Sequence, residues 1–301
     1  MSTAREPSAL RRAVLAITLL DQGDLADLEV VEGGVQRTGR TPSPVIGWDE
    51  LLLAGGDPHD DEGEPVRRRR VARWLRIRLL LHDLVDGPHV PNRDAAATAV
   101  ASRVRPRGLP RDHALHPGPG WTRRTILGGA LDLGLALRGV DDDGRADPDA
   151  VGVLPAGMLE AAGIDAHAGA DRAERYLQDM ADLGAQRFRL DSSAVLRPLG
   201  DADVLTLLAS RTYRVALLDG EGMRSAAVPV RTRGWLDLGR LDPAFAVTAA
   251  EITDPDERGF PRPVLVTRDE VTLVKAGGAA IAQSLADPAP PERGTAVERI
   301  F

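Results

Sequence analysis

Apolar and polar positions recur at helical spacing along much of the chain up to about residue 200. The clearest example is segment 66–85, where apolar side chains fall three and four residues apart while Arg69, Arg73 and Arg76 share another face. A Gly-Pro pair ends this predicted helix. Further helices are predicted, from the same spacing or from capping residues, at 8–20, 48–53, 93–104 (after Asn92), 155–162, 170–183 and 201–210.

A glycine-rich apolar segment, 125–140, follows Arg123 and Arg124. Asp132 and Arg138 interrupt it, and it is shorter than the roughly 20 residues that a membrane-spanning helix requires. We therefore predict a buried helix in this segment and no membrane span.

The N-terminal segment has a basic pair, Arg11 and Arg12, before a short apolar run at 13–20. A secretory signal would next present small residues at a cleavage site, whereas this chain presents Asp21 and Asp24. A first core helix is the better interpretation of the run. Because neither a signal nor a membrane span is predicted, a cytoplasmic location is expected.

The pattern changes after residue 210, where β-branched and apolar runs predict strands. The predicted strands are 212–218, 226–231, 246–252, 264–267 and 271–274, with turn signals at 219–222 and 268–270. Together these elements predict an α+β fold, with a mainly helical N-terminal two-thirds followed by a small, mostly antiparallel sheet of about five strands.

The predicted organisation follows this change of pattern. It comprises a mainly helical region at 1–200, a strand-rich α+β region at 201–286 with a short helix at 279–285, and a polar, mobile tail at 287–301. One fused core is an equal alternative to two domains.

The composition excludes several kinds of site. The 301 residues are 43% hydrophobic and 28% charged, as in folded globular proteins, and their net charge of -7 argues against a protein whose main partner is nucleic acid. The chain has no cysteine, which excludes thiolate metal sites and cysteine nucleophiles. Lys275 is the only lysine and no Gly-Lys-Ser/Thr loop is present, which excludes a standard nucleotide-binding P-loop.

The segment from His116 to Thr125 is the strongest candidate for a ligand site. Its Gly/Pro loop is predicted to open a helix, and exposed amides at a helix N-terminus favour anions. Glycine permits a close approach, and arginine grips phosphate or carboxylate with two hydrogen bonds. The predicted anion-binding residues are Gly118, Gly120, Thr122, Arg123 and Arg124. The alternative is an ordinary capped loop whose arginines pair with nearby carboxylates.

Two histidines of the same region, His113 and His116, are weak candidates for acid–base groups. No pair of histidines has the spacing of a helical zinc motif, and the acidic run 141–144 departs from a calcium loop, because Ala150 stands where that loop needs a glutamate. No metal site and no cofactor are therefore predicted.

These observations leave three hypotheses for function. The leading one is a bacterial cytoplasmic protein without catalytic activity that binds a protein partner or associates with itself, through an arginine-rich helix face and charged loops. The alternative is an enzyme or sensor that binds an anionic small molecule, bearing phosphate or carboxylate, at the Gly118–Arg124 segment. A DNA-binding regulator is the third and weakest, since acidic residues beside the arginines favour pairing within the chain.

Overall fold

The computed structural model describes residues 25, 27–39, 43–54, 64–118, 120–126, 129–191, 193–237, 243–269 and 271–273. The helices in this part of the chain are α2 (Trp48–Ala54), α3 (Glu64–Asp86), α4 (Arg93–Ser102), α5 (Met158–Ala161), α6 (Ala166–Leu190), α7 (Val204–Leu208), α8 (Arg211–Leu218) and α9 (Pro243–Ile252). None of the described helices combines the length and the apolar character needed to cross a bilayer.

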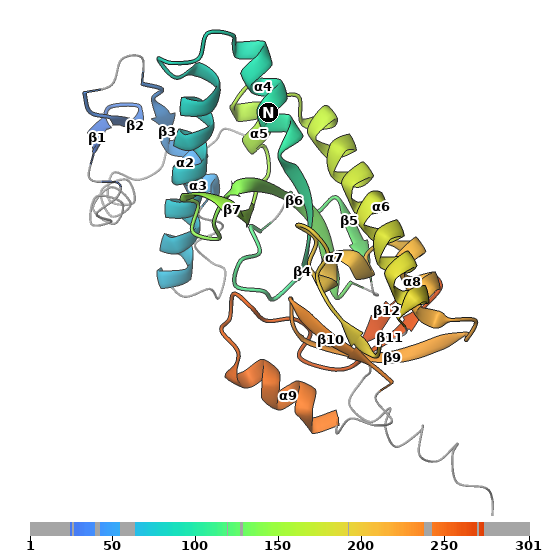
Figure 1. Cartoon of the computed structure of the whole chain (residues 1–301). Helices are drawn as coiled ribbons and strands as arrows, with labels where there is room; N and C mark the ends of the chain where they lie inside the picture. Colours follow the sequence, from blue (N-terminus) through green and yellow to red (C-terminus); the bar gives the residue numbers. More distant parts are fainter. Residues whose placement is uncertain are drawn as a thin grey trace, which may run out of the picture.

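The described strands form three antiparallel sheets (Figure 1). The first has the order β1 (Leu28–Val31), β2 (Gly34–Arg37), β3 (Ile46–Gly47). In the second, the long β6 (Leu131–Val140) pairs on one side with β4 (Val104–Pro110) and elsewhere with β5 (Arg124–Ile126) and β7 (Ala146–Val153). The third has the order β12 (Val271–Leu273), β11 (Val264–Thr267), β9 (Met223–Val230), β10 (Arg233–Leu236), β8 (Val195–Leu196).

The second sheet is the centre of the fold. Figure 1 shows it between α3 on one side and the long α6 on the other, with the third sheet and α9 beyond its far end. Buried apolar side chains gather in two large clusters, one around α3 and one between the third sheet, α7 and α8. The helix α6 contributes to both clusters, through Ala173 and Phe188 respectively.

The predicted fold class is wrong, because strands occur throughout the described chain and not only after residue 200. The main error is segment 125–140, which contains β5 and β6 instead of a buried helix. Leucine occupies every second position from Leu131 to Leu137, which is the period of a strand. This alternation outweighs the overall apolar content on which the helix prediction was based.

Gly134 in β6 allows the second sheet to pack against Trp121. A Cβ added at this glycine would lie 2.2 Å from the Trp121 ring, so no other residue fits without moving the ring. The indole Nε1 donates a hydrogen bond to the carbonyl of Leu135 at 3.0 Å. Gly134 therefore permits the close approach of an indole ring to β6.

Two of the predicted strands are helices. Segment 212–218 lies in α8, where Tyr213, Ala216 and Leu217 are buried on one face. Segment 246–252 lies in α9, which begins at Pro243, a residue well suited to the first turn of a helix. The strand prediction at 226–231 and the hairpin of β11 with β12 are confirmed.

The helix predictions at 48–53, 66–85, 93–104, 155–162, 170–183 and 201–210 are confirmed, with shifted ends. Asn92 caps α4 as predicted, since its side chain accepts a hydrogen bond from the amide of Ala95. Gly184 does not end α6, which continues to Leu190. The predictions at 8–20, 279–285 and 287–301 lie outside the described residues, and the division at residue 200 stays a prediction.

The arginine-rich face of α3 is turned toward the protein interior. Arg69 pairs with Asp143 at 2.8 Å and with Asp256 at 2.5 Å. Gly144, in the turn after β6, lies against the backbone of Arg73, because a Cβ on this glycine would lie 2.7 Å from the carbonyl oxygen of Arg73. The acidic turn after β6 therefore packs against α3 and is not a solvated loop. This arrangement confirms pairing within the chain as the role of Arg69.

A cluster of charged side chains lies beneath this turn. Arg231 is 4% exposed and contacts Asp142 at 3.3 Å, Asp203 at 3.9 Å and Glu257 at 3.2 Å, and Arg107 lies 3.7 Å from both Asp142 and Asp203. Burial raises the pKa of Asp142 to about 6, although Arg107 opposes the shift. These pairs connect β4, the β6–β7 turn and the third sheet.

Candidate functional site

A cavity of about 720 Å³ opens between the first turns of α3, the loop that follows β4, and α9 with the segment after it. In Figure 1, α9 lies beyond the N-terminal end of α3. The loop contributes His113, His116 and Gly118, so three of the residues singled out in the sequence lie together here. The volume lies within the range of about 300–1,000 Å³ that is typical of small-molecule sites.

His113 is fixed by hydrogen bonds at both ring nitrogens. Its Nδ1 accepts from the amide of Leu115 at 3.1 Å, so the proton lies on Nε2, which is 3.1 Å from the carbonyl oxygen of Arg258. Burial lowers the pKa of His113 to about 4, and Arg107 adds to this shift. The ring is therefore neutral at pH 7 and ties the loop to the segment after α9.

His116 is held in the same way by other partners. Its Nδ1 accepts from the amide of Gly118 at 3.1 Å, and its Nε2 lies 3.2 Å from Oδ2 of Asp132. The ring also meets Trp121 edge to face, with centroids 4.9 Å apart. Burial lowers the pKa of His116 although Asp132 opposes the shift, so this imidazole too is neutral at pH 7.

Asp132 is the anchor of this loop. It is buried in β6, and its Oδ1 accepts a hydrogen bond from the hydroxyl of Thr125 at 2.7 Å. Burial by itself would raise the pKa of Asp132, but the hydroxyl hydrogen bonds from Thr125 and Thr122, together with Arg111, lower it below the ordinary value. An ionised Asp132 thus orients His116 from the floor of the loop.

Three arginines supply positive charge around the cavity. Arg70 comes from α3 and is buried, Arg111 follows β4, and Arg258 follows α9. Arg111 is 61% exposed and lies 3.5 Å from Asp132, and no ion pair joins Arg258 to a carboxylate among the described residues. The lining itself has two carboxylates, Asp112 and Glu251, and the ionised Asp132 behind it offsets part of the charge of Arg111.

The residues of the predicted anion site are divided between different places in the structure. Gly118 lines the cavity, and both Gly118 and Gly120 have a positive φ, at 95° and 83°, which favours glycine. Thr122 donates to Asp132 and caps no helix. Arg123 and Arg124 line a separate hollow of about 150 Å³ beside α6, where Arg124 lies 3.8 Å from Glu174.

The physical basis predicted for the anion site is therefore absent. The Gly/Pro loop leads into β5 and not into a helix, so the helix N-terminus on which the prediction relied does not form. The sequence reasoning missed Arg70, Arg111 and Arg258. Arg70 belongs to a conspicuous arginine run, but only the folded chain brings that run next to a loop 40 residues later and to the segment after α9.

This arrangement favours binding over proton transfer. Both imidazoles are neutral at pH 7, and each uses its two nitrogens within the protein. The exposed arginines Arg111 and Arg258 offer donors to a ligand, and apolar side chains such as Val66, Val247 and Pro261 complete the wall. No group of three or more histidine, aspartate or glutamate side chains in the described chain is placed to hold a metal ion.

Comparison with known proteins adds no family to this description, since no family model, curated protein or solved structure matches the chain.

Proposed function

We propose that the protein binds a small molecule bearing a carboxylate or phosphate group in the cavity lined by Arg70, Arg111 and Arg258. The observation that carries this proposal is the cavity itself, in which three arginines from distant parts of the chain outnumber two carboxylates. Guanidinium groups in a concave site bind oxyanions through paired hydrogen bonds and charge. The expected cytoplasmic location is part of the same proposal.

The lining also suggests what else the ligand carries. Val66 and Val247 face the cavity from α3 and α9, and Pro110, Pro255 and Pro261 add further apolar surface. A ligand with an apolar portion next to its anionic group would cover these side chains, and burying apolar area contributes about 25 cal/mol per Å². A bare inorganic ion would leave most of the cavity to water.

A thermal-shift screen tests this proposal. Probes are mono- and dicarboxylates and organic phosphates of graded apolar size, measured on the wild type, on Arg258→Gln and on an Arg123→Gln/Arg124→Gln control. Arg258 and Arg123 are exposed and have no ion pair in the described structure, and Arg124 has only an exposed 3.8 Å contact with Glu174, so each variant should keep the fold. We expect stabilisation that is lost in Arg258→Gln and kept in the control.

Two results would count against the cavity. One is the absence of any stabilising probe. The other is equal loss in both variants, or loss in the Arg123→Gln/Arg124→Gln control alone. The latter result would place anion binding at the segment predicted from the sequence, near Arg124 and Glu174.

Partner binding, the leading hypothesis from the sequence, is a second proposal with less support. Leu53, Leu190 and Ile252 are 84%, 82% and 81% exposed, but they belong to three different helices. Single exposed apolar side chains are normal on protein surfaces and do not define an interface. DNA binding has still less support, because the α3 arginine Arg69 is occupied by Asp143 and Asp256.

A further inference from the structure

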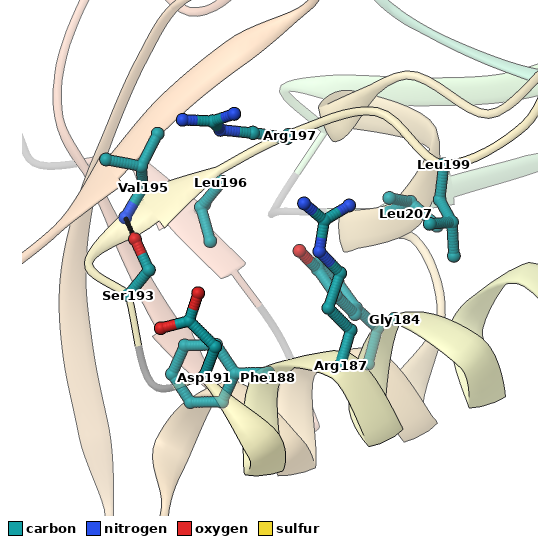
Figure 2. Close-up of a pocket in the computed structure, with 11 residues that line it drawn as sticks. Gly184, Arg187, Phe188, Asp191, Ser193, Val195, Leu196, Arg197, Leu199 and Leu207 are labelled. Carbon is teal, nitrogen blue, oxygen red and sulfur yellow. Dashed lines mark hydrogen bonds between the residues drawn. The ribbon is translucent and has the colours of Figure 1, made fainter.

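A second hollow, of about 150 Å³, lies between the end of α6, the strand β8 and the start of α8 (Figure 2). Its polar lining comes mainly from Arg187, Ser193, Arg197 and Tyr213. In Figure 2, the side chain of Arg187 points from α6 toward β8, the side chain of Arg197 runs beside β8 toward Val195, and Ser193 lies near Asp191. None of these residues lines the larger cavity.

Tyr213 is the unusual member of this lining. It is 5% exposed, and its ring packs so closely on α6 that a Cβ on Gly184 would lie 2.9 Å from its Cε2 atom. No hydrogen bond joins its hydroxyl to another residue in the described part of the chain. Burial raises the pKa of Tyr213 to about 12, so the hydroxyl is protonated at neutral pH and available as a donor.

The two arginines also have no charged partner among the residues that the structure describes. Neither Arg187 nor Arg197 forms an ion pair with a described carboxylate, and the exposed Asp191 lines the same hollow. The position of Arg187 in the last turn of α6 complements the helix dipole, which accounts for one cation. It does not account for Arg197 or Tyr213, which line the same hollow.

The hydroxyl of Ser193 can also act as a hydrogen-bond donor. Ser193 Oγ accepts a hydrogen bond from the amide of Val195 at 3.2 Å, which leaves its own O–H free to donate into the hollow. Arg187, Arg197, Ser193 and Tyr213 thus present donors, and Asp191 at the rim is the one charged acceptor in the lining. Such a set matches a ligand that only accepts hydrogen bonds and carries negative charge.

We propose that this hollow is a binding site for a phosphate group, held by the guanidinium groups of Arg187 and Arg197 and by the hydroxyls of Tyr213 and Ser193. The site is independent of the cavity described above and uses none of its residues. Its volume suits inorganic phosphate or the terminal phosphate of a larger molecule that extends past the exposed arginines.

Inorganic phosphate is the probe for the test, titrated at constant ionic strength into the full chain. Isothermal titration calorimetry gives the dissociation constant for the wild type, Tyr213→Phe, Arg187→Gln, Arg189→Gln and the larger-cavity variant Arg258→Gln. Arg189 is the matched control, because it is exposed in the same last turn of α6 but does not line the hollow. Each site variant removes a donor to a charged group, so we expect its dissociation constant to rise about tenfold or more.

The expected pattern is saturable binding by the wild type and by Arg189→Gln, with weakened binding by Tyr213→Phe and Arg187→Gln. Without phosphate, Tyr213→Phe should melt at the wild-type temperature, since the hydroxyl has no hydrogen-bond partner among the described residues. Three results would overturn the site: no saturable binding by the wild type, equal weakening in Arg189→Gln, or a lower melting temperature of phosphate-free Tyr213→Phe. Binding that is lost in Arg258→Gln instead would assign phosphate to the larger cavity.

Discussion

Replacing Thr206 with valine should remove a buried connection between α7 and the second sheet. The Thr206 hydroxyl accepts a hydrogen bond from the amide of Gly108 in β4 at 2.9 Å and donates one to Oδ1 of Asp203 at 2.7 Å. Thr206 is 0% exposed, so water cannot replace either partner. Gly108 also permits the close approach, because a Cβ there would lie 3.1 Å from the amide nitrogen of Thr206.

The size of the effect follows from these two contacts. A hydrogen bond to a charged group contributes about 1.5–3 kcal/mol, and a buried amide left without an acceptor costs about 1–3 kcal/mol. Valine keeps the shape of threonine, and the second bond to Asp203, from the Thr206 amide at 2.8 Å, survives the substitution. We therefore expect Thr206→Val to lower the free energy of unfolding by about 3 kcal/mol.

Urea unfolding followed by far-ultraviolet circular dichroism measures this difference. Thr206→Ser is the control, since it keeps both hydrogen bonds and loses one methyl group, which costs about 1 kcal/mol. A loss below about 1 kcal/mol in Thr206→Val, or an equal loss in both variants, would refute the role given to the hydroxyl.

Three further predictions concern single positions. Gly134→Ala should displace the ring of Trp121, lower stability by about 1–3 kcal/mol and shift the tryptophan emission; unchanged emission would contradict the packing. His113 has a folded pKa of about 4, below its unfolded value of about 6.5, so its contribution to stability is lost as pH falls between these values. The raised pKa of Asp142 changes stability with pH in the opposite direction, so the free energy of unfolding is measured against pH for the wild type and for His113→Leu. As pH falls, the variant should lose less stability than the wild type, and equal losses would contradict the prediction. Asp165 caps α6 by accepting two amide hydrogen bonds; Asp165→Ala should cost about 1 kcal/mol in urea unfolding and Asp165→Asn much less.

Much of the helical structure was predictable because it is encoded locally. The pattern of α3 repeats over six turns, and Asn92 marks the start of α4 directly. The alternating leucines of β6 indicated a strand, but the glycine content and the length of the apolar segment were also compatible with a buried helix. For α8, the run of Val215 to Leu218 resembles a strand, and its helical state depends on Tyr213 and Leu217 packing in the second apolar cluster.

The candidate site was predictable only in part. His113, His116 and Gly118 were found because they are neighbours in the sequence, and they do share one cavity. Arg70 and Arg258 could not be joined to them, because nothing local in the sequence reports contacts between segments so far apart. The role of Asp132 was also hidden, since a lone acidic residue in an apolar run gives no sign that it orients a histidine 16 residues earlier.

The central claim is that an anionic small molecule binds among Arg70, Arg111 and Arg258. The most direct measurement is a crystal structure of the protein grown with the most stabilising carboxylate or phosphate from the screen. The predicted result is electron density for the anionic group within hydrogen-bonding distance of Arg258 and Arg111, with the apolar portion against Val66 and Val247. Density for that ligand at any other site, or an empty cavity at saturating ligand, would contradict the claim.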